Sequence, residues 1–303
     1  MRGLNLKLVR YRNENREDYG ALLIDKIVSL SILAESMDIK LPVDIENFIT
    51  SESQQIGKLE EAIQKAEEEG VRKASHSVAS AKILTPIRSP GKIVCLGLNY
   101  RDHAAEQNAS VPDEPVIFMK PHTAIIGPND SIIKPSFVQQ LDYEAELVVV
   151  IGKRAKNVPL SDAHAHIFGY TIMNDVSARD IQFKDKQWTR GKSFDTFAPI
   201  GPCITTANEL EDTSNLRIQT WVNGELRQNS STKNMVFNPL EIIHRLSHVM
   251  TLEPCDIIAT GTPAGVGFAM KPKKFLQDGD KVRIEIEKIG VLENKIVEEN
   301  DAT

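Results

Sequence analysis

The chain has 303 residues, a formal charge of −6 at pH 7, 41% hydrophobic residues and 26% charged residues. This length suits one large domain with a smaller companion, since domains typically hold roughly 100–200 residues. The acidic charge argues against a nucleic-acid partner and against an anionic membrane surface.

The chain carries no sign of a membrane anchor or a targeting segment. No run approaches the roughly 18 apolar residues that a membrane helix needs. The arginines near the N-terminus are mixed with Glu14, Glu17 and Asp18, which is unlike a transit peptide. The three cysteines are widely separated, as in proteins of a reducing compartment. We therefore expect a cytoplasmic location.

The first part of the chain mixes strand and helix patterns. An alternation of apolar and polar residues predicts strands, and apolar residues at i, i+3, i+4 and i+7 predict helices. The strands are expected at 4–12, 19–24 and 26–30, and the helices at 44–50 and 58–69. We predict a small N-terminal α/β domain over residues 1–82.

After residue 82 the composition changes to short β-branched runs separated by proline and glycine turns. Such a region is mostly β and too irregular for βαβ repeats. The best strand candidates are 147–151, 168–173, 217–222, 256–259 and 282–288, and only 161–167 and 239–250 look helical. We predict an α+β, mostly β fold whose catalytic domain covers residues 83–303.

The segment DYEAELVVVIG holds two acidic residues that lead into an apolar run. On a strand, Glu144 and Glu146 share one face, about 6.5–7 Å apart along the chain, and Asp142 shares that face. Two carboxylates entering a core repel each other unless a cation neutralises them. Oxygen ligands favour Mg²⁺, Mn²⁺ or Ca²⁺ over Zn²⁺. The alternative is an exposed strand end with a solvated charged face.

Two further segments place polar groups beside apolar ones. In GYTIMNDVSARD, Asp175 follows an apolar strand, so it is either a ligand on a rigid scaffold or part of an Asx turn or helix cap. In LGLNYRDHAAEQN, His103 and Glu106 are neighbours on a helical turn. A carboxylate beside an imidazole suits a general base, although such pairs also occur on ordinary surfaces.

The last two segments are RGKSFDTFAPIGP and TGTPAGVG. Lys192, among aromatic residues and prolines, could stabilise developing negative charge, or could be a surface lysine. The glycine-rich loop could offer backbone N–H groups and the Thr262 hydroxyl to a carboxylate, or could be a simple turn.

The ordered set of these motifs, spanning residues 83–297, resembles the fumarylacetoacetate hydrolase family. The resemblance implies a mixed β-roll catalytic domain, usually dimeric, behind a small N-terminal domain. It implies Glu144, Glu146 and Asp175 as ligands of Mg²⁺, with Mn²⁺ possible, and His103 and Glu106 as a catalytic dyad on a mobile lid.

The resemblance also assigns roles around the metal. Lys192 matches the family's lysine near the metal. The expected substrate-binding residues are Tyr100, Arg179, Gln182 and Thr262. The acid that longer family members carry before the catalytic histidine is missing from LGLNY, so fumarylacetoacetate itself is not the expected substrate.

We therefore expect a Mg²⁺-dependent homodimeric hydrolase that cleaves a C–C bond through a metal-bound enolate. Its expected substrate is a small β-diketo acid, either an acylpyruvate or a compound like fumarylacetoacetate. Its partner is a small keto-acid substrate, with no nucleic acid and no membrane. Two alternatives remain open: an oxaloacetate tautomerase or decarboxylase using the same metal, and a non-catalytic, metal-stabilised dimeric binding protein.

Overall fold

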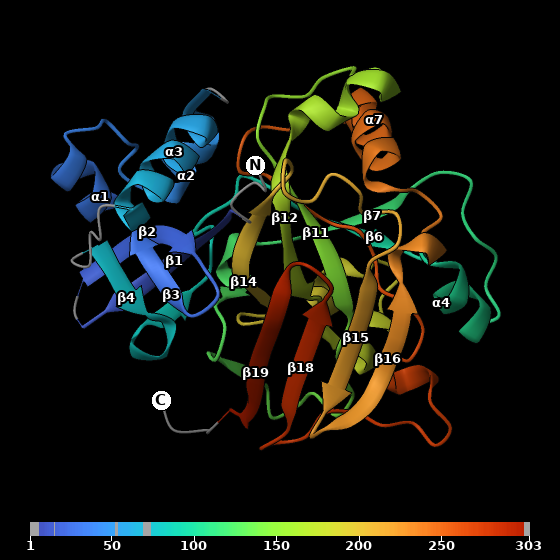
Figure 1. Cartoon of the computed structure of the whole chain (residues 1–303). Helices are drawn as coiled ribbons and strands as arrows, with labels where there is room; N and C mark the ends of the chain where they lie inside the picture. The colour runs from blue at the N-terminus through green and yellow to red at the C-terminus, as the bar shows by residue number, and fades with distance from the viewer. Residues whose placement is uncertain (1–5, 15, 52–53, 69–73, 300–303) are drawn as a thin grey trace.

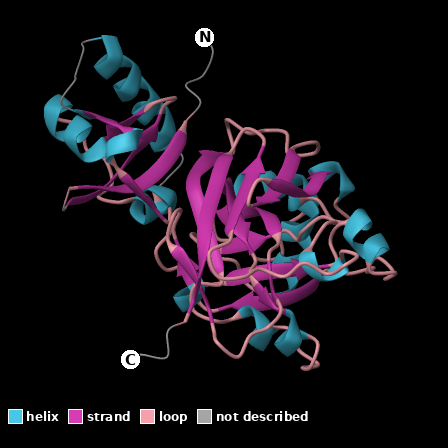
Figure 2. Ribbon diagram, turned by 90° about the horizontal axis from the view of Figure 1, so that it is seen from below, coloured by secondary structure: helices cyan, strands magenta, loops and turns pink. Residues whose placement is uncertain are grey.

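The computed structural model describes residues 6–14, 16–51, 54–68 and 74–299. Strands and helices of the N-terminal part, in blue, lie beside a larger body built mainly of strands (Figure 1). The same two parts are distinct in the view from below (Figure 2). None of the described helices combines the length and apolarity that crossing a bilayer requires.

The N-terminal part is a set of antiparallel strands with helices beside them. β2 pairs with β1 on one side and with β3 on the other. The elements are β1 (Lys7–Asn13), β2 (Arg16–Leu22), β3 (Lys26–Ser29), α1 (Leu30–Met37), α2 (Ile45–Thr50), α3 (Gln54–Glu68), β4 (Ser75–Ser77), a 3-10 turn (Val78–Ser80) and β5 (Lys82–Leu84).

The predicted elements of this part are confirmed with shifted ends, and one helix is missed. Residues 4, 5 and 69 of the predicted elements lie outside the described residues. The missed helix, α1, begins directly after β3, and the Ser29 hydroxyl caps it by accepting from the Ile32 backbone. A strand and a helix with no turn between them leave no boundary in the hydrophobic pattern.

The N-terminal strands continue the main sheet. β1 pairs with β14 (Ala198–Thr206), so that Leu8 stands opposite Ile204. The result is a 12-stranded sheet with the order β4-β3-β2-β1-β14-β12-β11-β17-β6-β7, in which β5 pairs with β1 and β8 pairs with β14. The predicted boundary after residue 82 falls inside β5, and the division into two domains stays a proposal.

The centre of this sheet is the antiparallel pair β11 (Ala145–Ile151) and β12 (Ile167–Asn174). Both strands are buried along their whole length, which explains their continuous apolar sequence. Leu147 and Val149 enter one hydrophobic core, whereas Val148 and Val150 enter another. Successive side chains alternate faces, so β11 separates two cores.

A second sheet packs against the first. It has five strands in the order β16-β15-β18-β19-β9. Ile218 of β15 and Ile284 of β18 lie in the same core as Leu147. The strands are β9 (Ser131–Lys134), β15 (Arg217–Val222), β16 (Glu225–Ser231), β18 (Lys281–Ile286) and β19 (Gly290–Glu298).

The described residues hold six further strands and several 3-10 turns. The strands are β6 (Ile93–Gly97), β7 (Val116–Lys120), β8 (Ile125–Ile126), β10 (Leu141–Asp142), β13 (Ser177–Ala178) and β17 (Ile257–Ala259). The 3-10 turns span His122–Ala124, Thr232–Asn234 and Gly267–Ala269. The strand predictions at 147–151, 168–173, 217–222, 256–259 and 282–288 are confirmed within a few residues.

Helices are few in the larger part. The predicted helix 239–250 is α7 (Pro239–Val249), which begins with a capping box between Asn238 and Glu241. The predicted helix 161–167 is a 3-10 helix (Leu160–His166). α4 (Arg101–Glu106) contains the helical turn expected for His103 and Glu106, whereas two further short helices were not predicted: α5 (Arg179–Gln182) and α6 (Thr189–Lys192). Helices of four to six residues are too short to show a 3.6-residue period.

Candidate metal centre and catalytic site

Three carboxylates meet where β11 begins and β12 ends. In the antiparallel register Ala145 stands opposite Asn174, so Glu144 and Asp175 are the next opposed residues. The Asp175 backbone N–H donates to the Glu144 carbonyl at 2.9 Å. Ligand oxygens of Glu144, Glu146 and Asp175 all lie within 4.8 Å of one another, and the three residues are buried.

The strand that carries the glutamates is interrupted, unlike the continuous strand of the prediction. β10 ends at Asp142 and β11 begins at Ala145, which leaves Tyr143 and Glu144 between them. Asp142 is not part of the triad. Its two oxygens accept from the backbone N–H groups of Gly267 and Phe268, at 2.8 and 3.0 Å.

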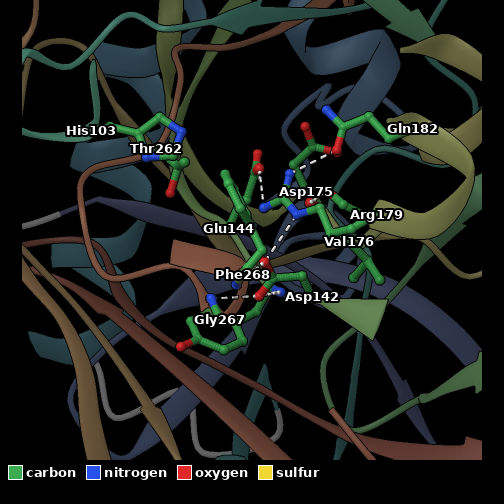
Figure 3. A network of polar contacts seen from close by, with 12 residues as sticks. His103, Asp142, Glu144, Asp175, Val176, Arg179, Gln182, Thr262, Gly267 and Phe268 are labelled. Atoms are coloured by element: carbon green, nitrogen blue, oxygen red, sulfur yellow. Dashed lines mark hydrogen bonds and ion pairs between the residues drawn. The ribbon is translucent and has the colours of Figure 1, made fainter. Parts of the chain in front are cut away.

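Buried cations neutralise part of this negative charge. Lys192 Nζ donates to Glu144 Oε2 and to Asp175 Oδ2, each at 2.8 Å. The Arg179 guanidinium lies between Asp142 and Glu144, and it also donates to Gln182 Oε1 (Figure 3). Lys120 Nζ, at the end of β7, donates to the second oxygen of Asp175. Lys120 was missed by sequence reasoning, and the signal available was a lysine ending an apolar strand before Pro121.

The two glutamates differ in their proton affinity. Burial would raise the pKa of Glu144, but Lys192 and Arg179 beside it prevail and lower that pKa to about 2. Burial raises the pKa of Glu146 well above its usual range, and the charges of Asp175 and Glu144 raise it further. Within the described part of the chain, Glu144 and Asp175 form ion pairs with buried cations, whereas no ion pair is found for Glu146.

The residues present fit a divalent cation. Glu146 Oε2 accepts from the Gly261 backbone N–H at 2.8 Å, whereas Oε1 is buried and has no hydrogen-bond partner among the described residues. A buried orphan oxygen is costly unless something such as a metal ion satisfies it. Carboxylate oxygens suit hard cations such as Mg²⁺ or Mn²⁺, and the identity of the metal stays a prediction.

The predicted dyad forms on α4. His103 Nδ1 lies 2.6 Å from Glu106 Oε1, and the Gly265 backbone N–H donates to the other Glu106 oxygen at 2.8 Å. The second ring nitrogen of His103 lies 2.7 Å from the side-chain nitrogen of Gln107. A carboxylate acceptor at Nδ1 places the proton there, which leaves Nε2 as the basic nitrogen. Sequence reasoning did not single out Gln107.

A cavity of about 80 Å³ joins the dyad to the metal site. It is lined by Glu144, by three of the predicted polar residues (His103, Lys192 and Thr262), and by Gln107 together with aromatic side chains. In the close-up, His103 and Thr262 lie together on one side of Glu144 (Figure 3). The structure therefore brings the predicted base, the lysine and the loop threonine around one small space.

Of the other predicted substrate-binding residues, two line the cavity and one does not. Arg179 and Gln182 line the cavity, although both are engaged in the buried network. Tyr100 is fully buried and is not among the residues that line the cavity. Their roles in binding substrate stay predictions.

The glycine-rich loop holds protein carboxylates. Backbone N–H groups of Gly261, Gly265 and Gly267 donate to Glu146, Glu106 and Asp142 respectively. The expectation that these N–H groups serve a substrate carboxylate is therefore not met, because the chain's own side chains occupy them. The loop instead fixes one ligand, one member of the dyad and the partner of Arg179.

Comparison with known proteins identifies the family. The sequence pattern of the family described as fumarylacetoacetate (FAA) hydrolase C-terminal matches residues 92–297. The chain belongs to this family, as the motifs indicated.

Individual relatives are similar along the chain. A Dictyostelium discoideum protein named fumarylacetoacetate hydrolase domain-containing protein 2 homolog is 45% identical over 305 residues, 96% of this chain and 97% of that protein. A Bos taurus protein named oxaloacetate tautomerase FAHD2B, mitochondrial, is 52% identical over 216 residues, 71% of this chain and 69% of that protein.

A solved structure supports the fold class. Fumarylacetoacetate hydrolase from Exiguobacterium antarcticum is 34% identical, with a TM-score of 0.81 over 97% of this chain and 100% of that one. The predicted mostly β fold of the fumarylacetoacetate hydrolase type is confirmed.

Proposed function

We propose that this protein is a metal-dependent oxaloacetate keto–enol tautomerase. One observation carries the proposal: His103, Lys192 and Thr262 line a single small cavity beside the carboxylate triad. That arrangement offers a base, a cation and a hydroxyl to a small keto acid. Relatives at 48–52% identity are named oxaloacetate tautomerase, which favours this activity over the hydrolase that we first expected.

The proposed reaction moves one proton. His103 Nε2 takes a proton from the methylene carbon of oxaloacetate, and the C–H electron pair becomes part of a C=C bond. Negative charge moves to the keto oxygen, which then accepts the proton that His103 has taken, so that the enol forms and His103 returns to its neutral state. Glu106 holds His103 through Nδ1 and stabilises its charged form. Lys192 lines the same cavity, where its charge would stabilise the negative charge of the substrate.

Glu144, Glu146 and Asp175 would hold the cation. A divalent ion bound there would polarise the keto oxygen and lower the cost of charge on it. The aromatic side chains that line the cavity, among them Phe118, would exclude bulk water and so strengthen the electrostatic interactions with the keto oxygen.

A carbon–carbon hydrolase is the second candidate. It is favoured by the same dyad, since His103 with Glu106 can also take a proton from water. The Exiguobacterium structure at 34% identity carries a hydrolase name.

Homodimer formation and a cytoplasmic location also remain proposals, which sedimentation and cell fractionation would test.

The purified protein with Mg²⁺ should be assayed on oxaloacetate and on acetylpyruvate, following enol absorbance and pyruvate release separately. We expect fast loss or gain of oxaloacetate enol without pyruvate. His103→Ala should lower this rate by about 100-fold or more, and EDTA should abolish it. His164→Ala, which changes an exposed histidine outside the cavity, is the matched control.

The outcomes separate the candidates. Pyruvate from acetylpyruvate would favour the hydrolase, and pyruvate from oxaloacetate would favour a decarboxylase. Turnover unaffected by both EDTA and His103→Ala would contradict every version of the proposal.

A further inference from the structure

Gln228 of β16 is a fully buried amide beside the cavity loop. Its Oε1 accepts from the Ala145 backbone N–H at 3.0 Å and from the Thr220 hydroxyl at 2.8 Å. Its Nε2 donates to Thr262 Oγ1 at 2.8 Å and to the Pro263 carbonyl at 2.9 Å. All four hydrogen-bonding positions of the side chain are thereby used.

The surroundings allow only one orientation of this amide. The Ala145 backbone nitrogen can only donate, so it must face the amide oxygen. The Pro263 carbonyl can only accept, so it must face the amide nitrogen. Turning the amide over would oppose donor to donor and acceptor to acceptor at buried positions, at the cost of several lost hydrogen bonds.

This orientation sets the polarity of Thr262. Because its oxygen receives the N–H of Gln228, the hydroxyl proton must point elsewhere. In the described part of the chain that hydroxyl donates to no protein acceptor, and Thr262 lines the cavity. The threonine is therefore a hydrogen-bond donor toward whatever fills the cavity.

The backbone fixes the loop against the same strand. Gly265 has φ +104, and a Cβ there would lie 2.2 Å from the Arg227 carbonyl. Ala145, which binds the other side of the Gln228 amide, stands between the two glutamates of the triad. One amide thus links the metal-binding strand to the loop that carries Thr262.

We propose that Gln228 is a positioning residue that makes Thr262 a donor to the substrate, so that the site selects a ligand with an accepting group, such as a carboxylate, at that position. This inference rests on the proposed function, because it takes the cavity as the substrate site. Gln228 itself does not touch the substrate.

Oxalate is a suitable probe, since its oxygens only accept hydrogen bonds. Its dissociation constant for the Mg²⁺-loaded protein should be measured by calorimetry, beside KM and kcat for oxaloacetate. Gln228→Glu keeps the side-chain volume but replaces the N–H donor by an acceptor, which would capture the Thr262 proton. We expect oxalate binding to weaken about tenfold to hundredfold and KM to rise by more than kcat falls.

A double-mutant cycle tests whether the effect runs through the hydroxyl. Thr262→Val should weaken oxalate binding as Gln228→Glu does, and combining the two should add little. Thr262→Ser keeps the hydroxyl group, so its oxalate binding should be close to that of the wild type. Thr220→Val is the matched control, because it removes a bond to the same amide but leaves the orientation set by Ala145 and Pro263; its oxalate binding should match the wild type.

Gln228→Met provides an uncharged second variant in case Gln228→Glu does not fold. Wild-type oxalate affinity in either folded variant or in Thr262→Val, no oxalate binding to the wild type, or full additivity in the cycle overturns the inference. Failure of the proposed function has a different signature: the wild type leaves oxaloacetate enol unchanged while the oxalate comparisons hold.

Discussion

At the scale of single residues, the sharpest contrast is between the proton affinities of Glu146 and its neighbour Glu144. It is buried, one oxygen has no hydrogen-bond partner among the described residues, and its pKa is raised while that of its neighbour Glu144 is lowered to about 2. In the metal-free folded protein Glu146 therefore keeps a proton at a pH where an exposed glutamate has lost it. A cation must displace that proton to bind both glutamates.

Metal affinity should consequently depend on pH. Because one proton leaves Glu146 on binding, Mg²⁺ affinity should rise with pH by about tenfold per unit until the raised pKa is passed. Calorimetry in buffers of different ionisation heat would count the released protons. Glu146→Gln should weaken binding and abolish the release, and binding without proton release by the wild type would contradict this account.

Glu106 orients the base without touching the metal ligands. Its carboxylate receives His103 Nδ1–H on one oxygen and the Gly265 N–H on the other. Glu106→Gln keeps the volume but weakens this support for the charged imidazole, so the turnover rate should fall by about 100-fold. Steady-state kinetics and Mg²⁺ titration would check that the rate falls while metal affinity holds. A parallel loss of metal affinity would point to a collapsed site instead.

Among the elements, the loop from Gly261 to Phe268 has the greatest effect on the site, because it binds three carboxylates from separate parts of the chain. Its geometry depends on close approach. Gly265 has a positive φ, and a Cβ added there would collide with the Arg227 carbonyl. Gly279 also has a positive φ, of +86, but a Cβ added there would meet open space. Substituting Gly279 would therefore cause backbone strain alone, whereas substituting Gly265 would cause the same strain and a steric clash as well.

Gly265→Ala and Gly279→Ala therefore form a matched pair. Both place a side chain in the left-handed region, which costs about 1–2 kcal/mol. In Gly265→Ala the new side chain must also push the loop away from β16. This variant should therefore lose further stability and most of its activity. Chemical denaturation and the tautomerase assay would measure both effects. Equal activity in the two variants would show that the loop tolerates displacement.

For the whole molecule, the shared sheet predicts a single folding unit. The β1–β14 pairing joins the N-terminal strands to the main sheet, and Leu8 is fully buried in a core that also contains Val148 of β11. The only two tryptophans, Trp188 and Trp221, lie in the larger part. Their fluorescence therefore reports on the larger part alone.

Leu8→Ala should lower the free energy of unfolding measured by tryptophan fluorescence by about 2–5 kcal/mol. The reason is that the cavity left by the substitution in β1 lowers the stability of the whole cooperative unit, which includes the larger part if the two parts unfold together. Urea denaturation followed by fluorescence and by circular dichroism would test this. A fluorescence transition that Leu8→Ala leaves in place would mean that residues 1–82 fold as an independent domain.

Local patterns in the sequence predicted much of this protein. Alternation and apolar runs located β11, β12, β15, β17 and β18, since side chains of a strand alternate between faces. The spacing of Glu144 and Glu146 indicated a cation site, and the spacing of His103 and Glu106 on one helical turn indicated their contact. These inferences concern residues a few positions apart, where backbone geometry dictates proximity. The ordered motifs extended them to the family.

Only the tertiary structure decided which distant groups meet. The register of β11 against β12 placed Asp175 opposite Glu144, and the packing of β7 and β16 brought Lys120 and Gln228 to the same site. It also assigned the loop N–H groups to the protein's own carboxylates. Contacts between residues far apart in the chain depend on sheet order and packing, for which a single sequence holds no periodic signal.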